Sequence, residues 1–459
     1  MDGQVTRRQV LKAGIVGAAG LTVLPAVLAA CGTSSATAAP TGGVGQLTGT
    51  LKIGSNHSDK SEKSGMDAIN AAFATATGLT PTMNTVDHNT FQDQINNYLL
   101  GTPDDAFTWF SGFRMRFFAD KGFGTPIDDV WSQVSSNYTA GFTTAVTGND
   151  SHVYGIPVDY YPWCVFYRPS VFTAKGYTVP TTWDDFITLC KKMQTDGLTP
   201  IAFSDKDGWP AMGTFDILDL RLNGYDFHVG LLSGANKWTD PKVTAVFTKW
   251  KELIPYYTSG YAGLTWQQAC DTLISKKAGM FLLGLFLTGE FSTVEKTVTD
   301  LDFFPFPTVG STYDAEAALD APIDIWMISA KSPTLTADVA NAKAYLQFFS
   351  KGSTQVLMYK ANNGFIPTAN DADTSSYDPL TKKAVSIVSA AKKITQFLDR
   401  DTRPDFAGAN GMQSFLLTFL KDPTTDLAAL QSQIQAFWDA LPEYKVAPVP
   451  TPAPPTAAS

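Results

Sequence analysis

Cysteine and histidine are scarce in this sequence, with four residues of each among 459. The histidines are far apart, so there is no His-Glu-x-x-His zinc motif, and the cysteines lack any metal-binding spacing. With so few cysteines, the fold must depend on its hydrophobic core rather than on a disulfide framework. We therefore expect neither a metal nor a cofactor.

Charged residues are also few, at 17% of the sequence against the usual ~25%. The formal net charge of −9 argues against nucleic acid or an anionic membrane surface as the main partner. The hydrophobic fraction is 44%, and the glycines and prolines show no period, which excludes disordered and collagen-like chains. A chain of this length predicts about three domain-sized units or two large ones.

Motifs of common catalytic sites are absent as well. The sequence contains no Gly-x-Ser-x-Gly elbow and no Ser-x-x-Lys set with its partners. Residues 54–61 resemble a phosphate-binding loop but lack its second glycine, and residues 371–376 begin like a calcium loop without its glycine. Paired carboxylates for glycoside hydrolysis stay open, because an acidic chain offers many candidates.

The N-terminus does carry a pattern, that of an export signal over residues 1–30. Arg7 and Arg8 form a basic head, and an apolar stretch runs from Ala13 to Ala30. The paired arginines resemble a twin-arginine signal, although the choice between that route and general secretion stays open. Cys31 follows Leu-Ala-Ala, as in a bacterial lipobox, which predicts that it is acylated.

Two segments of low complexity flank the body of the chain. Residues 31–46 are mostly Gly, Ser, Thr, Ala and Pro and predict a flexible tether, and residues 446–459 predict a disordered tail. If Cys31 carries lipid, then Cys164, Cys190 and Cys270 remain, so at most one disulfide can form. We therefore expect an exported protein that is anchored by lipid to the outer face of the cytoplasmic membrane, or is periplasmic.

Between these segments, short apolar runs alternate with amphipathic helices, which is typical of an α/β fold. Strands are predicted at residues 50–54, 82–86, 107–110 and 200–203. A helix with Gly78 as its stop follows the first strand, and Thr182 is a good N-cap for a helix that closes at Gly197. A further helix is predicted at 338–350, and no internal repeat is present.

Several segments resemble, in order, the family 1 extracellular solute-binding proteins, which are the substrate receptors of sugar ABC importers. The resemblance rests on residues 154–168 (YGIPVDYYPWCVFYR), 180–185 (PTTWDD), 197–201 (GLTPI), 277–284 (KAGMFLLG), 303–307 (FFPFP) and 364–367 (GFIP). Each motif is short, but their order covers the whole body. The departures are Ala278 and Gly279 in the fourth motif, and Phe286 where the family has Trp.

The resemblance implies a two-lobed periplasmic-binding-protein fold, with discontinuous lobes joined by crossing hinge strands. We expect lobe I to contain residues 47–155 and 282–322, and lobe II to contain 156–281 and 323–445. The crossings are expected near 155–158, 279–282 and 321–326. The ligand would lie in the cleft and the lobes would close on it.

Sugars present apolar C–H faces that stack on aromatic rings. Trp209 lies in a polar loop after a predicted strand and corresponds to a stacking residue of the family. Phe286 stands near the family's Trp, and Trp266 opens a helix. Trp109 and Phe110 end the third predicted strand, where a core role is almost as well supported.

Sugar hydroxyls also require hydrogen-bonding side chains. The polar candidates lie near strand ends and expected hinges: His57, Asp59, Asp159, Tyr160, Asp320 and Asp324. Asp59 could equally cap the next helix. Asp320 and Asp324 lie within an apolar run, where an unpaired carboxylate is costly. Arg400 is expected in a solvated charge run or in an ion pair between the lobes.

These observations predict a monomeric carbohydrate-binding receptor that delivers a mono- or oligosaccharide to the permease subunits of an ABC importer and catalyses no reaction. One alternative is an exported glycoside hydrolase or lyase. Another is a binding protein of the same fold for a polyol, peptide or polyamine.

Overall fold

The computed structural model describes residues 45–332 and 335–442. The predicted signal peptide (1–30), Cys31, nearly all of the tether (31–46) and the tail (446–459) lie outside the described residues. Within the described part, no helix is both long and apolar enough to cross a membrane. Cys164, Cys190 and Cys270 are all buried and free.

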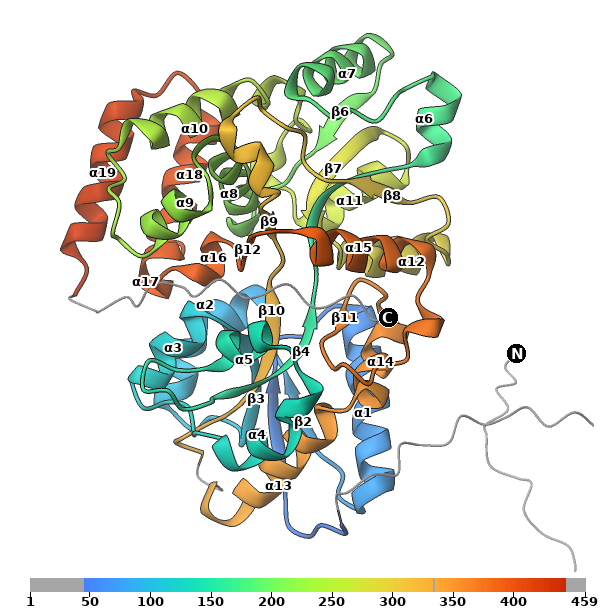
Figure 1. Ribbon diagram of the computed structural model, residues 1–459, viewed down its shortest axis with the longest axis vertical. Coiled ribbons are helices and arrows are strands. Elements are labelled where there is room, and N and C mark those ends of the chain that lie inside the picture. Colours follow the sequence, from blue (N-terminus) through green and yellow to red (C-terminus); the bar gives the residue numbers. More distant parts are fainter. Residues whose placement is uncertain (1–44, 333–334, 443–459) are drawn as a thin grey trace, which may run out of the picture. The chain divides into compact units, whose positions relative to one another are not determined.

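The first lobe is built on a six-stranded sheet with the order β11-β4-β10-β3-β1-β2 (Figure 1). Its strands are β1 (Lys52–Ser55), β2 (Thr82–Thr85), β3 (Ala106–Phe110), β4 (Gly155–Tyr160), β10 (Ile323–Ile328) and β11 (Ile366–Pro367). β1 runs parallel to β2 and β3, whereas β10 is antiparallel to β3 and β4. The parallel strands place their carboxyl ends, and the loops that follow them, at one edge of the sheet.

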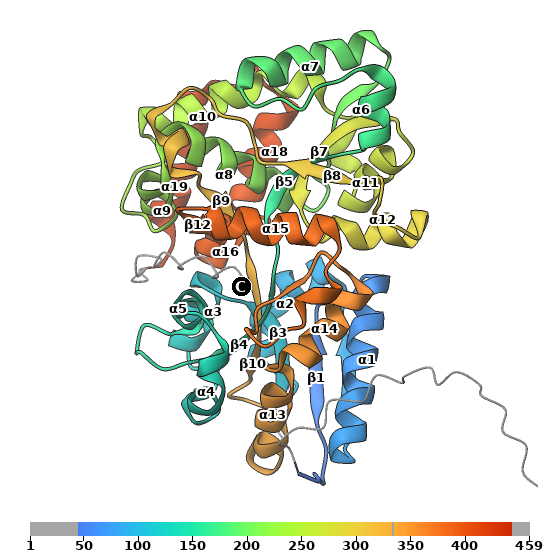
Figure 2. The same ribbon diagram turned by 45° about the vertical axis from the view of Figure 1, so that its right-hand side comes forward.

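Helices cover both faces of this sheet. They are α1 (Lys60–Thr77), α2 (His88–Leu100), α3 (Phe113–Asp120), α4 (Asp128–Val134), α5 (Ala140–Val146), α13 (Leu335–Phe349) and α14 (Gly352–Ala361). Figures 1 and 2 show α1 and α14 on one side of the sheet and α3, α4 and α5 on the other. Met66, Ile69 and Phe73 form the buried stripe of α1, and Gly78 ends that helix with φ +76°, as the sequence predicts.

The second lobe contains a four-stranded sheet with the order β6-β7-β5-β8. Its strands are β5 (Trp163–Tyr167), β6 (Thr199–Ala202), β7 (Ala278–Gly284) and β8 (Asp302–Phe304). A separate parallel pair joins β9 (Leu319–Asp320) to β12 (Ile394–Thr395).

The helices of this lobe are α6 (Pro169–Lys175), α7 (Trp183–Thr195), α8 (Trp209–Asn223), α9 (Tyr225–Leu232), α10 (Pro241–Lys251), α11 (Trp266–Ile274), α12 (Leu287–Glu295), α15 (Pro379–Ala390), α16 (Leu398–Asp401), α17 (Pro404–Ala407), α18 (Met412–Lys421) and α19 (Leu427–Ala440). Thr182 caps α7 as predicted, because its side chain accepts a hydrogen bond from the Asp185 amide. Short 3₁₀ helices complete the described chain: Ser135–Asn137, Ile254–Tyr256, Tyr261–Gly263, Thr312–Glu316 and Thr374–Ser376.

The chain passes between the lobes directly after β4, between β9 and β10, and again after β11. The first two crossings touch, since the Tyr161 amide donates to the Pro322 carbonyl at 3.3 Å. The crossing expected near 321–326 therefore lies close to its predicted place. The other two expected positions differ: 155–158 is inside β4, and 279–282 is inside β7.

The strand pairings also place the lobe boundaries elsewhere than expected. β7 pairs with β5 from Met280 to Gly284, and β8 pairs with the same strand, so residues 282–322 belong with the second lobe rather than the first. β10 pairs with β3 and β4, which places the chain from residue 323 to the end of β11 in the first lobe. The prediction was wrong here because a buried apolar strand reveals its existence but not its partners.

Candidate functional site

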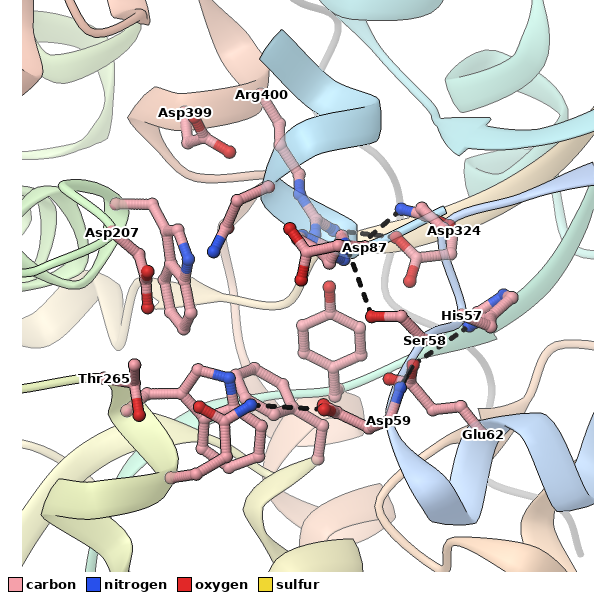
Figure 3. Close-up of a pocket in the computed structure, with 18 of the residues that line it drawn as sticks. His57, Ser58, Asp59, Glu62, Asp87, Asp207, Thr265, Asp324, Asp399 and Arg400 are labelled. Atoms are coloured by element: carbon pink, nitrogen blue, oxygen red, sulfur yellow. Dashed lines mark hydrogen bonds and ion pairs between the residues drawn. The ribbon is translucent and has the colours of Figure 1, made fainter. Parts of the chain in front are cut away.

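A cavity of about 420 Å³ lies where the two lobes meet (Figure 3). The first lobe contributes the strand-end and helix-start residues Asn56, His57, Ser58, Asp59, Glu62, Asp87, His88 and Asn89, together with Asp324 and Phe365. Tyr161 comes from the crossing, and the second lobe contributes Trp163, Lys206, Asp207, Trp209, Thr265, Trp266, Gln267, Phe286, Phe397, Asp399 and Arg400. The volume is in the range of small-molecule sites, about 300–1,000 Å³.

The first-lobe wall follows from helix capping. Asp59 precedes α1, and its backbone amide donates to the Glu62 carboxylate at 3.2 Å, which closes a capping box. Asp87 caps α2 by accepting the Thr90 amide at 3.0 Å. Gln267 of the second lobe donates to Asp59 at 3.2 Å. Asp59 is thus both a helix cap and a pocket residue, so the two roles weighed for it are compatible.

The second-lobe wall is aromatic. Trp209 lies edge-on to Trp163 and to Phe286, with ring centroids 6.1 and 6.0 Å apart, and Phe286 lies edge-on to Trp266 and Tyr161 at 5.2 Å each. These T-shaped contacts fix the orientation of each ring. The indole nitrogens of Trp163 and Trp209 are buried without a hydrogen-bond partner.

The sequence predicted that Trp209 lies in a loop, but it is the first residue of α8. The preceding Gly208 has φ +76°, a conformation that glycine adopts at little cost and that turns the chain into the helix. Only 7% of the Trp209 side chain is exposed. The helix start thus directs the indole into the pocket wall.

Two buried ion pairs join α16 to the first lobe. Arg400 donates to Asp324 of β10 at 2.8 Å, and Arg114 of α3 donates to Asp399 at 2.9 Å. Gln92 of α2 donates to both oxygens of the same Asp399 carboxylate. Arg400 therefore forms the pair between lobes that was one of the two expectations for it. Figure 3 shows its guanidinium extending toward Asp324.

Burial controls the protonation of the pocket. It lowers the pKa of His57 to about 3, with further contributions from His88 and Arg400, and it lowers the pKa of His88 to about 4. It raises the pKa of Glu62 well above its usual value, and the nearby Asp59 adds to this effect. The pKa of Asp324 is also raised by burial, although Arg400 opposes the shift. Both imidazoles are hence neutral at pH 7, and each offers one donor and one acceptor.

Six of the predicted ligand-binding residues line the cavity: His57, Asp59, Trp209, Trp266, Phe286 and Asp324. Figure 3 shows Asp207 and Thr265 across the pocket from His57, Glu62 and Asp324, so the walls of the two lobes face each other. The wall of aromatic rings and the wall of polar groups together suit a ligand with apolar faces and a rim of hydroxyls. Among the described residues, no group of three or more His, Cys, Asp or Glu side chains could hold a metal ion.

The other predicted residues lie outside this cavity lining: Trp109, Phe110, Asp159, Tyr160 and Asp320. Trp109 and Phe110 are each 1% exposed on β3 and belong to the core, although Phe110 lies 3.9 Å beneath the Arg400 guanidinium. Asp159 and Tyr160 end β4, and it is the next residue, Tyr161, that lines the pocket. Asp320 accepts a hydrogen bond from Thr395 in the small β9–β12 pair.

Several pocket residues were not among the sequence candidates, notably Glu62, His88, Tyr161, Trp163, Phe365 and Asp399. Glu62 was within reach of sequence reasoning, because it stands three residues after Asp59 in a capping box. Tyr161 and Trp163 flank a crossing whose position was predicted a few residues too early. Asp399 carries no local signal, since its partners Gln92 and Arg114 are 307 and 285 residues away in the chain.

Comparison with known proteins agrees with this architecture. The sequence profile of the bacterial extracellular solute-binding proteins matches residues 58–355. The chain belongs to this family. The solute-binding protein is 41% identical to the bacterial solute receptor AcbH, whose structure superimposes with a TM-score of 0.81 and which is described as having an exclusive preference for β-D-galactopyranose. The match covers 86% of this chain and 99% of that one.

Curated relatives are more distant. The solute-binding protein is 26% identical to an uncharacterised ABC transporter extracellular-binding protein of Pyrococcus horikoshii over 334 residues, which cover 72% of this chain and 71% of the relative. It is also 26% identical over 293 residues to a protein of Rhizobium meliloti named "Probable sugar-binding periplasmic protein", with 61% and 66% covered. The predicted family and the two-lobed α/β fold are thus confirmed.

Proposed function

We propose that this solute-binding protein is the extracytoplasmic receptor of an ABC importer and that its ligand is a sugar. The observation that carries the proposal is the 41% identity to a receptor for β-D-galactopyranose over 99% of that chain. The pocket supports it, since aromatic rings face neutral imidazoles and carboxylates across a cavity of about 420 Å³. β-D-Galactopyranose is therefore the first ligand to test.

In this proposal the indoles of Trp209 and Trp266 and the ring of Phe286 contact the apolar face of the sugar. Asp59 and Asp324 accept hydrogen bonds from its hydroxyls, and His57 donates or accepts. Because carboxylate acceptors form stronger hydrogen bonds than neutral ones, they also fix the orientation of the sugar ring.

The receptor acts as a monomer without catalysis, and closure of its two lobes presents the loaded form to the permease subunits. Small-angle scattering tests this step, because closure predicts a compaction at saturating ligand. An unchanged curve would argue for a rigid site.

Export and anchoring form a separate part of the proposal. The basic head and apolar stretch direct export, and acylation of Cys31 holds the receptor at the outer face of the cytoplasmic membrane. Cys31→Ala is expected to release the protein from the membrane fraction. Equal retention of the variant and the natural protein would contradict the lipid anchor.

The ligand is best identified by a thermal-shift screen of residues 47–445 against galactose, glucose, disaccharides, polyols and polyamines. A ligand at 100 times its Kd stabilises the folded state by about 2.7 kcal/mol, which raises Tm by a few degrees. Stabilisation by polyamines but by no sugar would overturn the proposal. Release of products from any saccharide would favour the hydrolase or lyase alternative.

A further inference from the structure

Residues 396–401, here called the arginine turn, supply Phe397, Asp399 and Arg400 to the pocket. The turn has an unfavourable backbone: Phe397 has φ +87° and ψ 153°, a region that residues with a side chain rarely adopt. Such a conformation persists only where its surroundings enforce it. The position of Arg400 in the pocket thus depends on what restrains this turn.

Two buried carboxyl groups accept hydrogen bonds from the backbone amides of the residues before and after Phe397. The Gln396 amide donates to Asp401 at 2.8 Å, within the turn itself. The Leu398 amide donates to Asp216 at 2.5 Å. Asp216 lies on α8 and is 182 residues away in sequence, so it anchors the turn to the body of the second lobe.

Asp216 is itself held by a second pair of buried residues, His228 and Asp219. Its second oxygen faces Nε2 of His228 on α9 at 3.7 Å, and Nδ1 of that histidine is 2.9 Å from Asp219. All three side chains are completely buried, and none of them lines the pocket. Burial alone would lower the pKa of His228, but Asp216 and Asp219 outweigh it and raise that pKa to about 9. A cationic imidazolium therefore stands between the two carboxylates at pH 7.

We propose that Asp216, supported by His228 and Asp219, is a positioning residue of the ligand site. Asp216 holds the arginine turn so that Asp399 and Arg400 meet the ligand. The affinity part of this inference rests on the proposed sugar-binding function, whereas its structural part does not. Asp216 touches no ligand and acts only through the Leu398 amide.

The first test uses the ligand-free protein. In Asp216→Ala the amides of the arginine turn should exchange with deuterium at least about tenfold faster, because a hydrogen bond to a buried carboxyl acceptor is lost. The matched control is Asp105→Ala at the opposite edge of the first sheet, where an equally buried carboxylate accepts the Lys52 amide at 2.8 Å. The control should leave exchange of the turn unchanged. Unaltered protection of the turn in Asp216→Ala would overturn the inference.

The second test measures D-galactose binding by calorimetry at a temperature where every variant is folded. Asp216→Ala should raise Kd about tenfold or more, and Asp216→Asn should restore part of the affinity because its amide oxygen can still accept from Leu398. Asp105→Ala should lower Tm and leave Kd unchanged. A purely structural role for Asp216 would give that same pattern and would contradict the proposal.

The two tests separate the proposals. If the natural protein binds no sugar, the proposed function fails, while amide exchange still decides whether Asp216 restrains the turn. If Asp216→Ala does not fold, Asp216→Asn replaces it in the exchange test, with an intermediate acceleration expected and no acceleration counting against the inference.

Discussion

Both walls of the pocket are formed by residues at helix starts, but the side chains at these positions differ between the two lobes. In the first lobe, Asp59 and Asp87 cap α1 and α2. In the second lobe, Trp209 and Trp266 are the first residues of α8 and α11, and Phe286 precedes α12. Helix starts thus form both walls, but one wall is polar and the other is aromatic.

This difference separates the two kinds of contact that a sugar needs. The first lobe offers mainly hydrogen-bonding groups, and the second offers the stacking surface. The second lobe also carries polar groups such as Asp207 and Arg400, so the hydrogen-bonding groups of the pocket come from both lobes and the stacking surface mainly from one. Two side-chain contacts span the walls, the Gln267–Asp59 hydrogen bond and the Arg400–Asp324 ion pair, and the ion pair forms a buried bridge.

Removing that bridge should have the largest effect. Arg400→Gln leaves the Asp324 carboxylate buried without its partner, which typically costs about 3–5 kcal/mol of folding free energy. Urea unfolding measures the loss. The double variant Arg400→Gln/Asp324→Asn should recover most of it, and a single variant as stable as the natural protein would show that the bridge contributes nothing.

The aromatic wall is tested by Trp209→Leu. Truncating a buried aromatic anchor costs about 2 kcal/mol of binding free energy, so Kd for the sugar should rise about thirtyfold in calorimetry. Trp238→Leu is the matched control, since it is a fully buried tryptophan in the core of the same lobe. The control should lower Tm without changing Kd. A lower Tm with unchanged Kd in Trp209→Leu would show that Trp209 is a core residue and does not contact the sugar.

The polar wall is tested through pH. The pKa of His57 falls to about 3 on folding, so below pH 6.5 the unfolded chain binds a proton that the folded protein does not. Acidification from pH 7 to 5 should therefore destabilise the natural protein by about 2 kcal/mol more than His57→Asn. Urea unfolding at both pH values measures the difference. His152→Asn, at an exposed histidine, is the control, and equal losses in the natural protein and in His57→Asn would contradict the burial argument.

The smallest effect is expected at Asp159, a predicted site residue that lies outside the cavity lining. Asp159→Asn should keep Kd within about twofold, because the residue does not line the cavity and the substitution conserves the size of the side chain. Its stability at pH 7 should not fall, because burial, with Asp324 and Glu62 nearby, already raises the pKa of this carboxyl well above its usual value. A large loss of affinity would show that Asp159, near the end of β4, belongs to the polar wall after all.

The sequence led to residues that line the cavity where a residue's position depends on its neighbours in the chain. His57 and Asp59 follow the first strand directly, and the parallel arrangement of β1 to β3 brings such loops to one edge. Trp109 and Phe110 lie outside the cavity lining, because the end of a buried strand has the same sequence pattern whether it enters a pocket or a core. Asp320 also lies outside it, and its hydrogen-bond partner Thr395 comes from β12.

The sequence by itself determined the alternation of helices and strands, the caps at Thr182 and Gly78, and the aromatic and acidic character of the helix starts, because these depend on interactions within a few residues. Only the tertiary structure decided which strands cross between the lobes and which carboxylate meets Arg400. That arginine pairs with a residue 76 positions away, and the shifted pKa of His57 arises from burial by elements far apart in the chain. Pairings and desolvation of this kind are properties of packing, which no local pattern encodes.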